Sequence, residues 1–273
     1  MSQQLSPSVF LFTDFGADSV YTGQMRGVLS RICPDVNIQT LTNTVPRQNT
    51  AAAAFLLSKS LDYLPAGAHV LCVVDPGVGS DRPIVCLRTD DPELTLLGPD
   101  NGMFARFEDR IDICRQVTND KLWLDHISNT FHGRDVMSPT LAHVAAGTPI
   151  QEVGPPHDDL QSLHNEQWFT SEMSSDHLSG YVIYADVFGN LITSISESGL
   201  RTFADHVDIQ DLNVQIGDYV ITGIESSYSA VPRGESLAII SSADQLEVAV
   251  NQGSATEELH AEPGDEVIVR QPE

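Results

Sequence analysis

Apolar positions in the first 150 residues alternate between short continuous runs and longer stretches with helical spacing. In residues 19–32, Met25, Val28, Leu29 and Ile32 follow the i, i+3, i+4, i+7 spacing of an amphipathic helix. Further helices are predicted at 49–64 and 135–146, and strands at 9–13, 36–42, 69–75, 83–88, 94–98 and 111–117. This alternation predicts an α/β domain with a mostly parallel sheet and helices on both faces.

The pattern changes after about residue 150, where Pro, Gly and polar residues replace the helical spacing. Short apolar runs then recur at regular spacing between Gly-rich turns, as in SGYVIYAD, GNLITSI, GDYVITG, SLAIIS, QLEVAV and DEVIVR. Such spacing is typical of a small β-barrel or sandwich. We therefore expect an α/β domain at 1–160, a linker at 161–176 and an all-β barrel domain at 177–273.

Composition narrows the class of protein. A net charge of −24 argues against nucleic acid as a partner, because phosphates require a basic surface. The charge weakly favours a cationic or neutral small ligand, although general solubility explains it more simply. No apolar run approaches the roughly 18 residues of a membrane helix, and the N-terminal segment lacks signal-peptide features. We expect a cytoplasmic protein without membrane association.

The cysteines and histidines give no sign of a metal site. Cys33, Cys72, Cys86 and Cys114 are widely spaced and form no CxxC pair, and three of them lie in or beside apolar runs. We expect buried free thiols rather than disulfides or zinc ligands. The histidines show no HxxxH or HxH spacing, so we expect no metal.

Two acidic residues come directly after predicted strands. Asp14 follows VFLFT and Asp75 follows VLCVV, and glycines follow both closely. Ligands of open α/β sheets bind at the carboxyl ends of the strands, and Asp14 is suited to accept both hydroxyls of a ribose. Either acid could instead cap its own loop through backbone N–H groups. The spacing alone leaves both interpretations open.

Arg82 and His132 are candidate partners of Asp75. His132 lies just before the helix predicted at 135–146, where the positive helix end should disfavour the protonated imidazole. A lone histidine in that place is more often a structural cap. Together with Asp75 and Arg82, however, His132 could take part in catalysis. Arg82 would hold Asp75 ionised, Asp75 would accept one proton of a water molecule, and His132 would orient that water.

The barrel segment contains two polar clusters. Asp186 and Asn190 flank a Phe-Gly turn in YADVFGNLITSI, and geometry alone could explain that turn. Ser242 and Glu247 lie in ISSADQLEVAVNQGS, which by itself is typical of an ordinary polar hairpin. Neither cluster identifies a site without further information.

Taken in order along the chain, these stretches resemble one family. They are TDFG at 13–16, VVDPGVG with Arg82, PDNGMF at 99–104, FHGRD at 131–135, DVFGN at 186–190 and SSADQLEVAVNQGSA. They are similar to motifs of the S-adenosylmethionine (SAM) hydroxide adenosyltransferases, adenosine-forming SAM hydrolases related to the fluorinase and chlorinase. Each motif is weak alone, but the ordered set is specific and spans about residues 9–270.

The resemblance implies an N-terminal α/β domain, a C-terminal β-barrel, and a homotrimer that holds SAM between domains of neighbouring subunits. It implies attack of water on ribose C5′, which gives adenosine and L-methionine, with SAM as substrate and no cofactor. Asp75, Arg82 and His132 match the water-activating triad. The implied substrate-binding residues are Asp14, Asp18, Asn101, Phe131, Asp186, Phe188, Asn190, Tyr228, Ser242, Glu247 and Val250.

Several of these residues match positions with specific roles. Asp14 matches the acid that binds the ribose. Asp186 and Asn190 match positions that hold the methionine end and the nucleoside, and Tyr228 matches an aromatic that stacks on adenine.

Two departures and two alternatives complete the hypothesis. The first departure is Arg47, which stands where the family often has an aromatic residue. The second concerns the related halogenases, which have an uncharged residue in place of Asp75. We therefore expect water rather than halide as the nucleophile. One alternative is a SAM or adenosine sensor with little turnover. The other is a metal-dependent phosphoesterase that uses Asp14, Asp75, Asp100 and His132.

Overall fold

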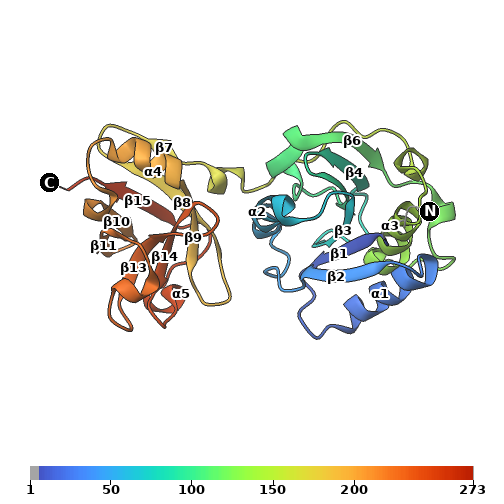
Figure 1. Ribbon diagram of the computed structural model, residues 1–273, viewed down its shortest axis with the longest axis horizontal. Coiled ribbons are helices and arrows are strands. Elements are labelled where there is room, and N and C mark those ends of the chain that lie inside the picture. Colours follow the sequence, from blue (N-terminus) through green and yellow to red (C-terminus); the bar gives the residue numbers. More distant parts are fainter. Residues whose placement is uncertain (1–5, 273) are drawn as a thin grey trace. The chain divides into compact units, whose positions relative to one another are not determined.

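The structure is a computed structural model that describes residues 6–272. The chain divides into two compact units, Met1–His164 and Asn165–Glu273, and the ribbon in Figure 1 follows the chain through both. The boundary lies inside the segment 161–176 that we predicted as a linker. The end of that segment is not a bare spacer, because β7 (Glu172–Met173) pairs with β8 (Leu178–Ala185) in the second unit.

The first unit is built on a six-stranded sheet in the order β2-β1-β3-β5-β4-β6. Its strands are β1 (Ser8–Thr13), β2 (Asn37–Thr42), β3 (Ala68–Val73), β4 (Ile84–Asp90), β5 (Glu93–Pro99) and β6 (Ile111–Gln116). Strands β2, β1, β3 and β5 are parallel, which confirms the prediction of a mostly parallel sheet. Strand β4 is antiparallel to both neighbours, since only a two-residue hairpin joins it to β5.

Helices cover both faces of this sheet, as predicted. They are α1 (Val20–Ile32), α2 (Thr50–Ser60) and α3 (Ser138–Ala145). Successive residues of a strand point to opposite faces. In β1, Val9 and Leu11 pack in one core with α1 and α3, whereas Phe10 and Phe12 pack in the other core with α2. The continuous apolar runs of the central strands therefore reflect burial on both faces.

The helix predicted at 135–146 begins in an unusual way. Residues Gly133–Met137 form a single π turn, and α3 continues from Ser138. The hydroxyl of Ser138 donates a hydrogen bond of 2.6 Å to the carbonyl oxygen of Gly133 and closes this turn. Isolated π turns occur often at functional sites. This one follows His132 directly.

The second unit is a nearly closed β-barrel, as predicted. Its further strands are β9 (Leu191–Ser196), β10 (Asn213–Ile216), β11 (Tyr219–Thr222), β12 (Ile224–Glu225), β13 (Ser236–Ile240), β14 (Gln245–Val250) and β15 (Glu266–Arg270). They follow the order β11-β10-β15-β8-β9-β14-β13-β12. The two end strands, β11 and β12, are separated in the chain by Gly223 alone, and β11 also lies against β13. The chain thus brings the two ends of the sheet together, and the barrel is nearly closed.

Two helices of the barrel unit were not predicted from the sequence, α4 (Glu197–Ala204) and the short α5 (Ala255–Glu258). The hydroxyl of Ser196 caps α4 by accepting a 3.1 Å hydrogen bond from the backbone N–H of Gly199. Leu200 and Phe203 are buried in the barrel core. Strand β10 was also missed, because its four residues are too few for a clear alternation.

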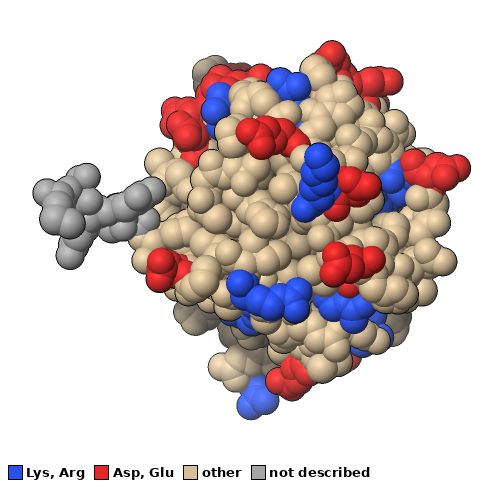
Figure 2. Space-filling model, turned by 90° about the vertical axis from the view of Figure 1, so that its right-hand side faces the viewer, with Lys and Arg blue, Asp and Glu red and all other residues tan. Residues whose placement is uncertain are grey.

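The negative charge is divided unevenly between the units. The first has eleven Lys and Arg against nineteen Asp and Glu, and the second has three against nineteen, which gives −8 and −16. Figure 2 shows acidic and basic side chains interspersed on one face of the first unit. The excess of negative charge therefore lies mainly on the barrel.

Cysteines serve as packing residues in the first unit. All four are free thiols; Cys33, Cys72 and Cys86 are buried, as predicted, whereas Cys114 is only half-buried. Burial raises the pKa of Cys72 and Cys86, so both remain protonated.

Among residues 6–272, none of the helices has the length and apolar character that crossing a lipid bilayer requires.

Candidate active site

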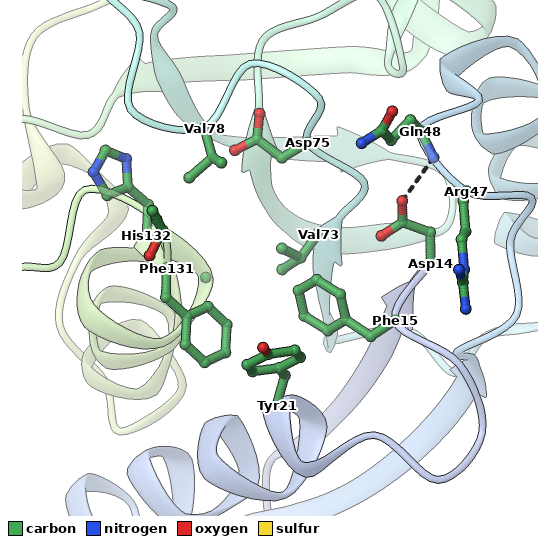
Figure 3. Close-up of a pocket in the computed structure, with 12 residues that line it drawn as sticks. Asp14, Phe15, Tyr21, Arg47, Gln48, Val73, Asp75, Val78, Phe131 and His132 are labelled. Atoms are coloured by element: carbon green, nitrogen blue, oxygen red, sulfur yellow. Dashed lines mark hydrogen bonds between the residues drawn. The ribbon is translucent and has the colours of Figure 1, made fainter.

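A pocket of about 360 Å³ lies at the carboxyl edge of the parallel strands. Strands β1, β3 and β5 end beside one another here, and Asp14, Asp75 and Asp100 follow them. The pocket, drawn in Figure 3, is lined by Asp14, Phe15, Tyr21, Arg47, Gln48, Val73, Asp75, Val78, Thr130, Phe131, His132 and Gly133. Two of the three strand-end acids therefore face it.

Asp75 is held by Arg82 through a two-pronged ion pair. The Nε of Arg82 donates to Asp75 Oδ1 at 2.6 Å, and its Nη2 donates to Oδ2. The Nη1 of Arg82 donates to the carbonyl oxygen of Pro83 at 3.1 Å. The side chain of Asp75 is only 6% exposed and that of Arg82 only 11%. A planar guanidinium bound in this way both neutralises a buried carboxylate and fixes its orientation. This pairing explains why a buried strand can be followed by an acid.

Glycines bring the loop after β3 against the loop before the π turn. Gly79 has a φ of +81°, and a Cβ at this position would lie 2.5 Å from the carbonyl oxygen of Asn129. A Cβ on Gly133 would lie 2.9 Å from a methyl group of Val73. Both contacts require glycine. The loop that carries Asp75 and Arg82 and the segment that carries His132 therefore meet at one pocket wall.

His132 is a neutral imidazole at neutral pH. Burial lowers its pKa, and the nearby Arg82 guanidinium lowers it further, while Asp75 and Asp135 act in the opposite direction. The sequence suggested the positive end of the following helix as the cause of this lower pKa, and the structure adds burial and the Arg82 guanidinium. The structure brings His132 and Asp75 into one pocket, with Arg82 bound to Asp75 beside them.

The lowered pKa of His132 predicts a one-sided acid limb in the pH profile of activity. Above its pKa the ring is neutral and can accept a hydrogen bond, and below it the ring is protonated and loses that capacity. We expect kcat/KM to be constant near neutral pH and to decrease only below the ordinary histidine value of 6.5. The measurement is a rate profile from pH 5 to 8. In His132→Gln the acid limb should disappear, and an unchanged limb would contradict this assignment.

Asp14 is positioned by the loop that precedes α2. The backbone N–H of Gln48 donates to Asp14 Oδ2 at 2.8 Å, and Gln48 adopts a φ of +58°. Within residues 6–272, no hydrogen bond to Asp14 Oδ1 is present, and the carboxylate faces the pocket. A carboxylate held in this way has free acceptor positions for two vicinal hydroxyls. Arg47 lines the pocket beside it (Figure 3).

Asn101, Asp100 and Asp18 do not line this pocket. Asn101 Nδ2 donates to the carbonyl oxygen of Val74 at 2.9 Å and so supports the backbone just before Asp75. Asp100 is buried, accepts a 2.9 Å bond from the backbone N–H of Gln161, and lies 2.9 Å from His157 Nε2. Asp18 is exposed beside the cap of α1. The predicted binding roles of Asn101 and Asp18 remain predictions, and Asp100 was a candidate only in the metal-dependent alternative.

The barrel unit has its own polar cluster around Asp186 and Glu247. Asp186 accepts hydrogen bonds from the backbone N–H groups of Phe188 and Asn190 at 2.8 and 2.9 Å, and from Asn190 Nδ2 at 3.1 Å. Tyr228 donates its hydroxyl to Glu247 at 2.7 Å. Burial and then the charge of Asp186 raise the pKa of Glu247, against the effect of Tyr228. Asp186 and Glu247, which come from the two polar clusters predicted in the barrel segment, therefore lie close enough to interact electrostatically.

Three other predicted residues of the barrel unit lie in different surroundings. Phe188 is 72% exposed at the tip of the turn between β8 and β9. Val250 is buried in the barrel core at the end of β14. Ser242 is exposed in the turn between β13 and β14, at the opposite end of β14 from Val250. Phe188 therefore joins the cluster around Asp186 only through its backbone N–H, and Val250 and Ser242 form no hydrogen bond with Asp186 among the described residues.

Sequence reasoning missed residues that help to form both sites. Phe15 and Tyr21 line the pocket, and Tyr21 is 52% exposed although it is a large aromatic. Tyr21 lies four residues before Met25, in line with the apolar stripe of α1, so the helical spacing alone assigns it to the core and not to a pocket. In the barrel, burial followed by the charges of Asp186 and Glu247 raises the pKa of Tyr184 to about 12. No spacing in the sequence pointed to this residue.

The arrangement does not favour the metal-dependent alternative. The carboxylate of Asp75 is engaged by Arg82, and that of Asp100 is engaged by His157 and Gln161 away from the pocket. Among the residues that the structure describes, no group of three or more His, Cys, Asp or Glu side chains could hold a metal ion.

The fold and the pocket define a two-domain protein in which an α/β unit with strand-end carboxylates precedes a small barrel. Residues 9–154 match the SAM hydroxide adenosyltransferase N-terminal domain, and residues 180–268 match the C-terminal domain of the same family. The chain belongs to the SAM hydroxide adenosyltransferase family.

Curated relatives and solved structures agree with this membership. An (R)-S-adenosyl-L-methionine hydrolase of Thermus thermophilus is 33% identical, over 94% of this chain and 96% of its own length. The hydrolase of Salinispora tropica is 32% identical, over 97% and 98%. A fluorinase of an Actinoplanes species is 24% identical, over 84% and 91%. A crystal structure of an uncharacterized conserved protein from Thermotoga maritima covers 97% of this chain and 100% of its own, with 30% identity and a TM-score of 0.86.

Proposed function

We propose that the protein hydrolyses SAM to adenosine and L-methionine, and that Asp75, Arg82 and His132 position the attacking water. The observation that carries this proposal is the buried Asp75–Arg82 pair beside a neutral His132 in one pocket. The names of the hydrolase relatives from Thermus thermophilus and Salinispora tropica support the choice of substrate and reaction.

The chemistry assigns separate tasks to these side chains. The water oxygen forms a bond to ribose C5′ while the bond from C5′ to sulfur breaks, and its electron pair neutralises the sulfonium to a thioether. The leaving group needs no acid. Asp75 accepts one proton of the water, and His132 accepts a hydrogen bond from the other O–H. The main requirement is alignment of oxygen, carbon and sulfur, with oxygen about 3 to 3.5 Å from carbon.

Asp75 also explains a preference for water over halide. A carboxylate polarises a water molecule but repels a dehydrated chloride or fluoride in a weakly screening pocket. The fluorinase relative from Actinoplanes shows that halide chemistry occurs among proteins similar to this one. We therefore propose hydrolysis and not halogenation.

The remaining predicted residues complete the proposed substrate site. Asp14 accepts the ribose hydroxyls, Asp186 meets the methionine ammonium, and Tyr228 stacks on adenine. We propose that a homotrimer brings the barrel of a neighbouring subunit to the pocket, with no cofactor. The free cysteines fit a reducing, cytoplasmic compartment.

Product analysis tests the reaction. Incubation of the protein with SAM should release adenosine and methionine in equal amounts, and EDTA should leave the rate unchanged. Chromatography that finds SAM intact after long incubation would contradict the proposal. Intact SAM together with tight adenosine binding would indicate a sensor, and loss of activity in EDTA would indicate a metal enzyme.

A further inference from the structure

Three aromatic side chains form one corner of the pocket. Phe15 comes from the loop after β1, Tyr21 from the first turn of α1, and Phe131 from the segment before the π turn. Their ring centroids lie 5.1 Å apart for Tyr21 and Phe131, 5.6 Å for Phe15 and Tyr21, and 5.9 Å for Phe15 and Phe131. Figure 3 shows the three rings together on the side of the pocket away from the Asp75 carboxylate.

The rings stand steeply to one another. The interplanar angles are 59°, 76° and 78°. Because the three ring centroids lie within 5.9 Å of one another, one cation seated against this corner can come within the ~6 Å range of a cation–π contact with all three rings. Aromatic corners of this kind bind methylated cations in other proteins.

Phe131 is held in place from outside the pocket. The guanidinium of Arg134 lies 5.0 Å from the centre of its ring, and Arg134 does not line the pocket. Arg134 Nε and Nη2 donate to Asp135 at 2.6 and 3.0 Å, and Nη1 donates to Gln24 at 3.1 Å. Phe131 is therefore held before any ligand binds, and the charge behind its ring is neutralised by Asp135.

The chemistry of SAM suits such a corner. Its methylated sulfonium is a cation that disappears as the bond from C5′ to sulfur breaks. A carboxylate at the sulfur would stabilise the charged substrate more than the transition state. Aromatic rings attract the sulfonium through their faces and still make favourable contacts with a neutral thioether. They lose less of their interaction during the reaction.

We propose that Phe15, Tyr21 and Phe131 form the subsite for the methylsulfonium group of SAM and select the charged sulfonium over a neutral thioether. The inference rests on the proposed function and assigns the specificity of the same pocket. Asp14 and Asp75 are then free for the ribose and the water.

Tyr21 provides the test, because it is 52% exposed and its substitution removes little buried surface. In an Asp75→Asn background that prevents turnover, calorimetry would measure affinities for SAM and for S-adenosyl-L-homocysteine, which lacks the methyl group and the charge. Tyr21→Leu should weaken SAM binding by roughly 3- to 30-fold and should reduce the preference for SAM at least about threefold. Tyr21→Phe, which keeps the ring, and Tyr63→Leu, an exposed tyrosine outside the pocket, should change neither value more than about twofold.

The outcomes separate this inference from the proposed function. Equal weakening of both ligands, no weakening, or no measurable binding of SAM to the parent would overturn the subsite. Loss of the preference for SAM in Tyr21→Leu would support the subsite, whether or not the native protein hydrolyses SAM. Absence of adenosine release from the native protein would contradict only the proposed hydrolysis.

Discussion

Replacement of Asp75 with alanine is expected to lower kcat/KM for SAM hydrolysis by about 10³-fold, within the range found for removal of a positioned proton acceptor. The carboxylate is the group that can accept a proton from the water, and its removal also leaves Arg82 without its partner. Adenosine release measured by chromatography gives the rate.

Asp75→Asn is the matched control for this experiment. The amide keeps the size of the side chain but not its negative charge, so we expect a similar loss of rate with SAM affinity within about tenfold of the native value. If either variant kept more than a tenth of the native rate, Asp75 would not be the group that activates water.

Replacement of Arg82 with methionine is expected to lower the free energy of unfolding by roughly 3 kcal/mol, because it leaves a buried carboxylate without its cation. The rate should fall as well, since Asp75 loses its fixed orientation. Urea denaturation and adenosine release measure the two effects. Arg88→Met breaks a more exposed pair with Asp112 in the same unit and should cost at most about 1 kcal/mol.

A double variant separates stability from catalysis. Combining Arg82→Met with Asp75→Leu removes both charges, so the free energy of unfolding should recover to within about 1 kcal/mol of the native value. Hydrolysis should remain abolished. An Arg82→Met protein as stable as the native one would show that the pair does not compensate a buried charge.

Much of the first unit could be predicted because its constraints are local. Strands β1 and β3 are buried on both faces, which requires continuous apolar runs in the sequence. The acidic residues that follow these runs are therefore easy to recognise. Parallel strands place their carboxyl ends at one edge, so Asp14 and Asp75 could be expected to share a pocket. The link from Asp75 to Arg82 spans only seven residues and could be anticipated.

The features that the sequence did not predict depend on contacts between distant segments, which the periodicity of apolar residues does not encode. The π turn before α3 brings Gly133 against Val73, from a segment about sixty residues earlier in the chain. Asn101 is turned toward the carbonyl oxygen of Val74, which no motif could reveal. Tyr21 enters the pocket because α1 begins beside the end of β1. These features arise only when distant segments pack together.

The central claim is that a water molecule held by Asp75, Arg82 and His132 attacks ribose C5′ of SAM. Its most direct test is incubation with SAM in water enriched in heavy oxygen, followed by mass spectrometry of the products. We predict one heavy oxygen atom in the 5′-hydroxyl group of adenosine and none in methionine. Unlabelled adenosine, or label in a product derived from methionine, would contradict the claim.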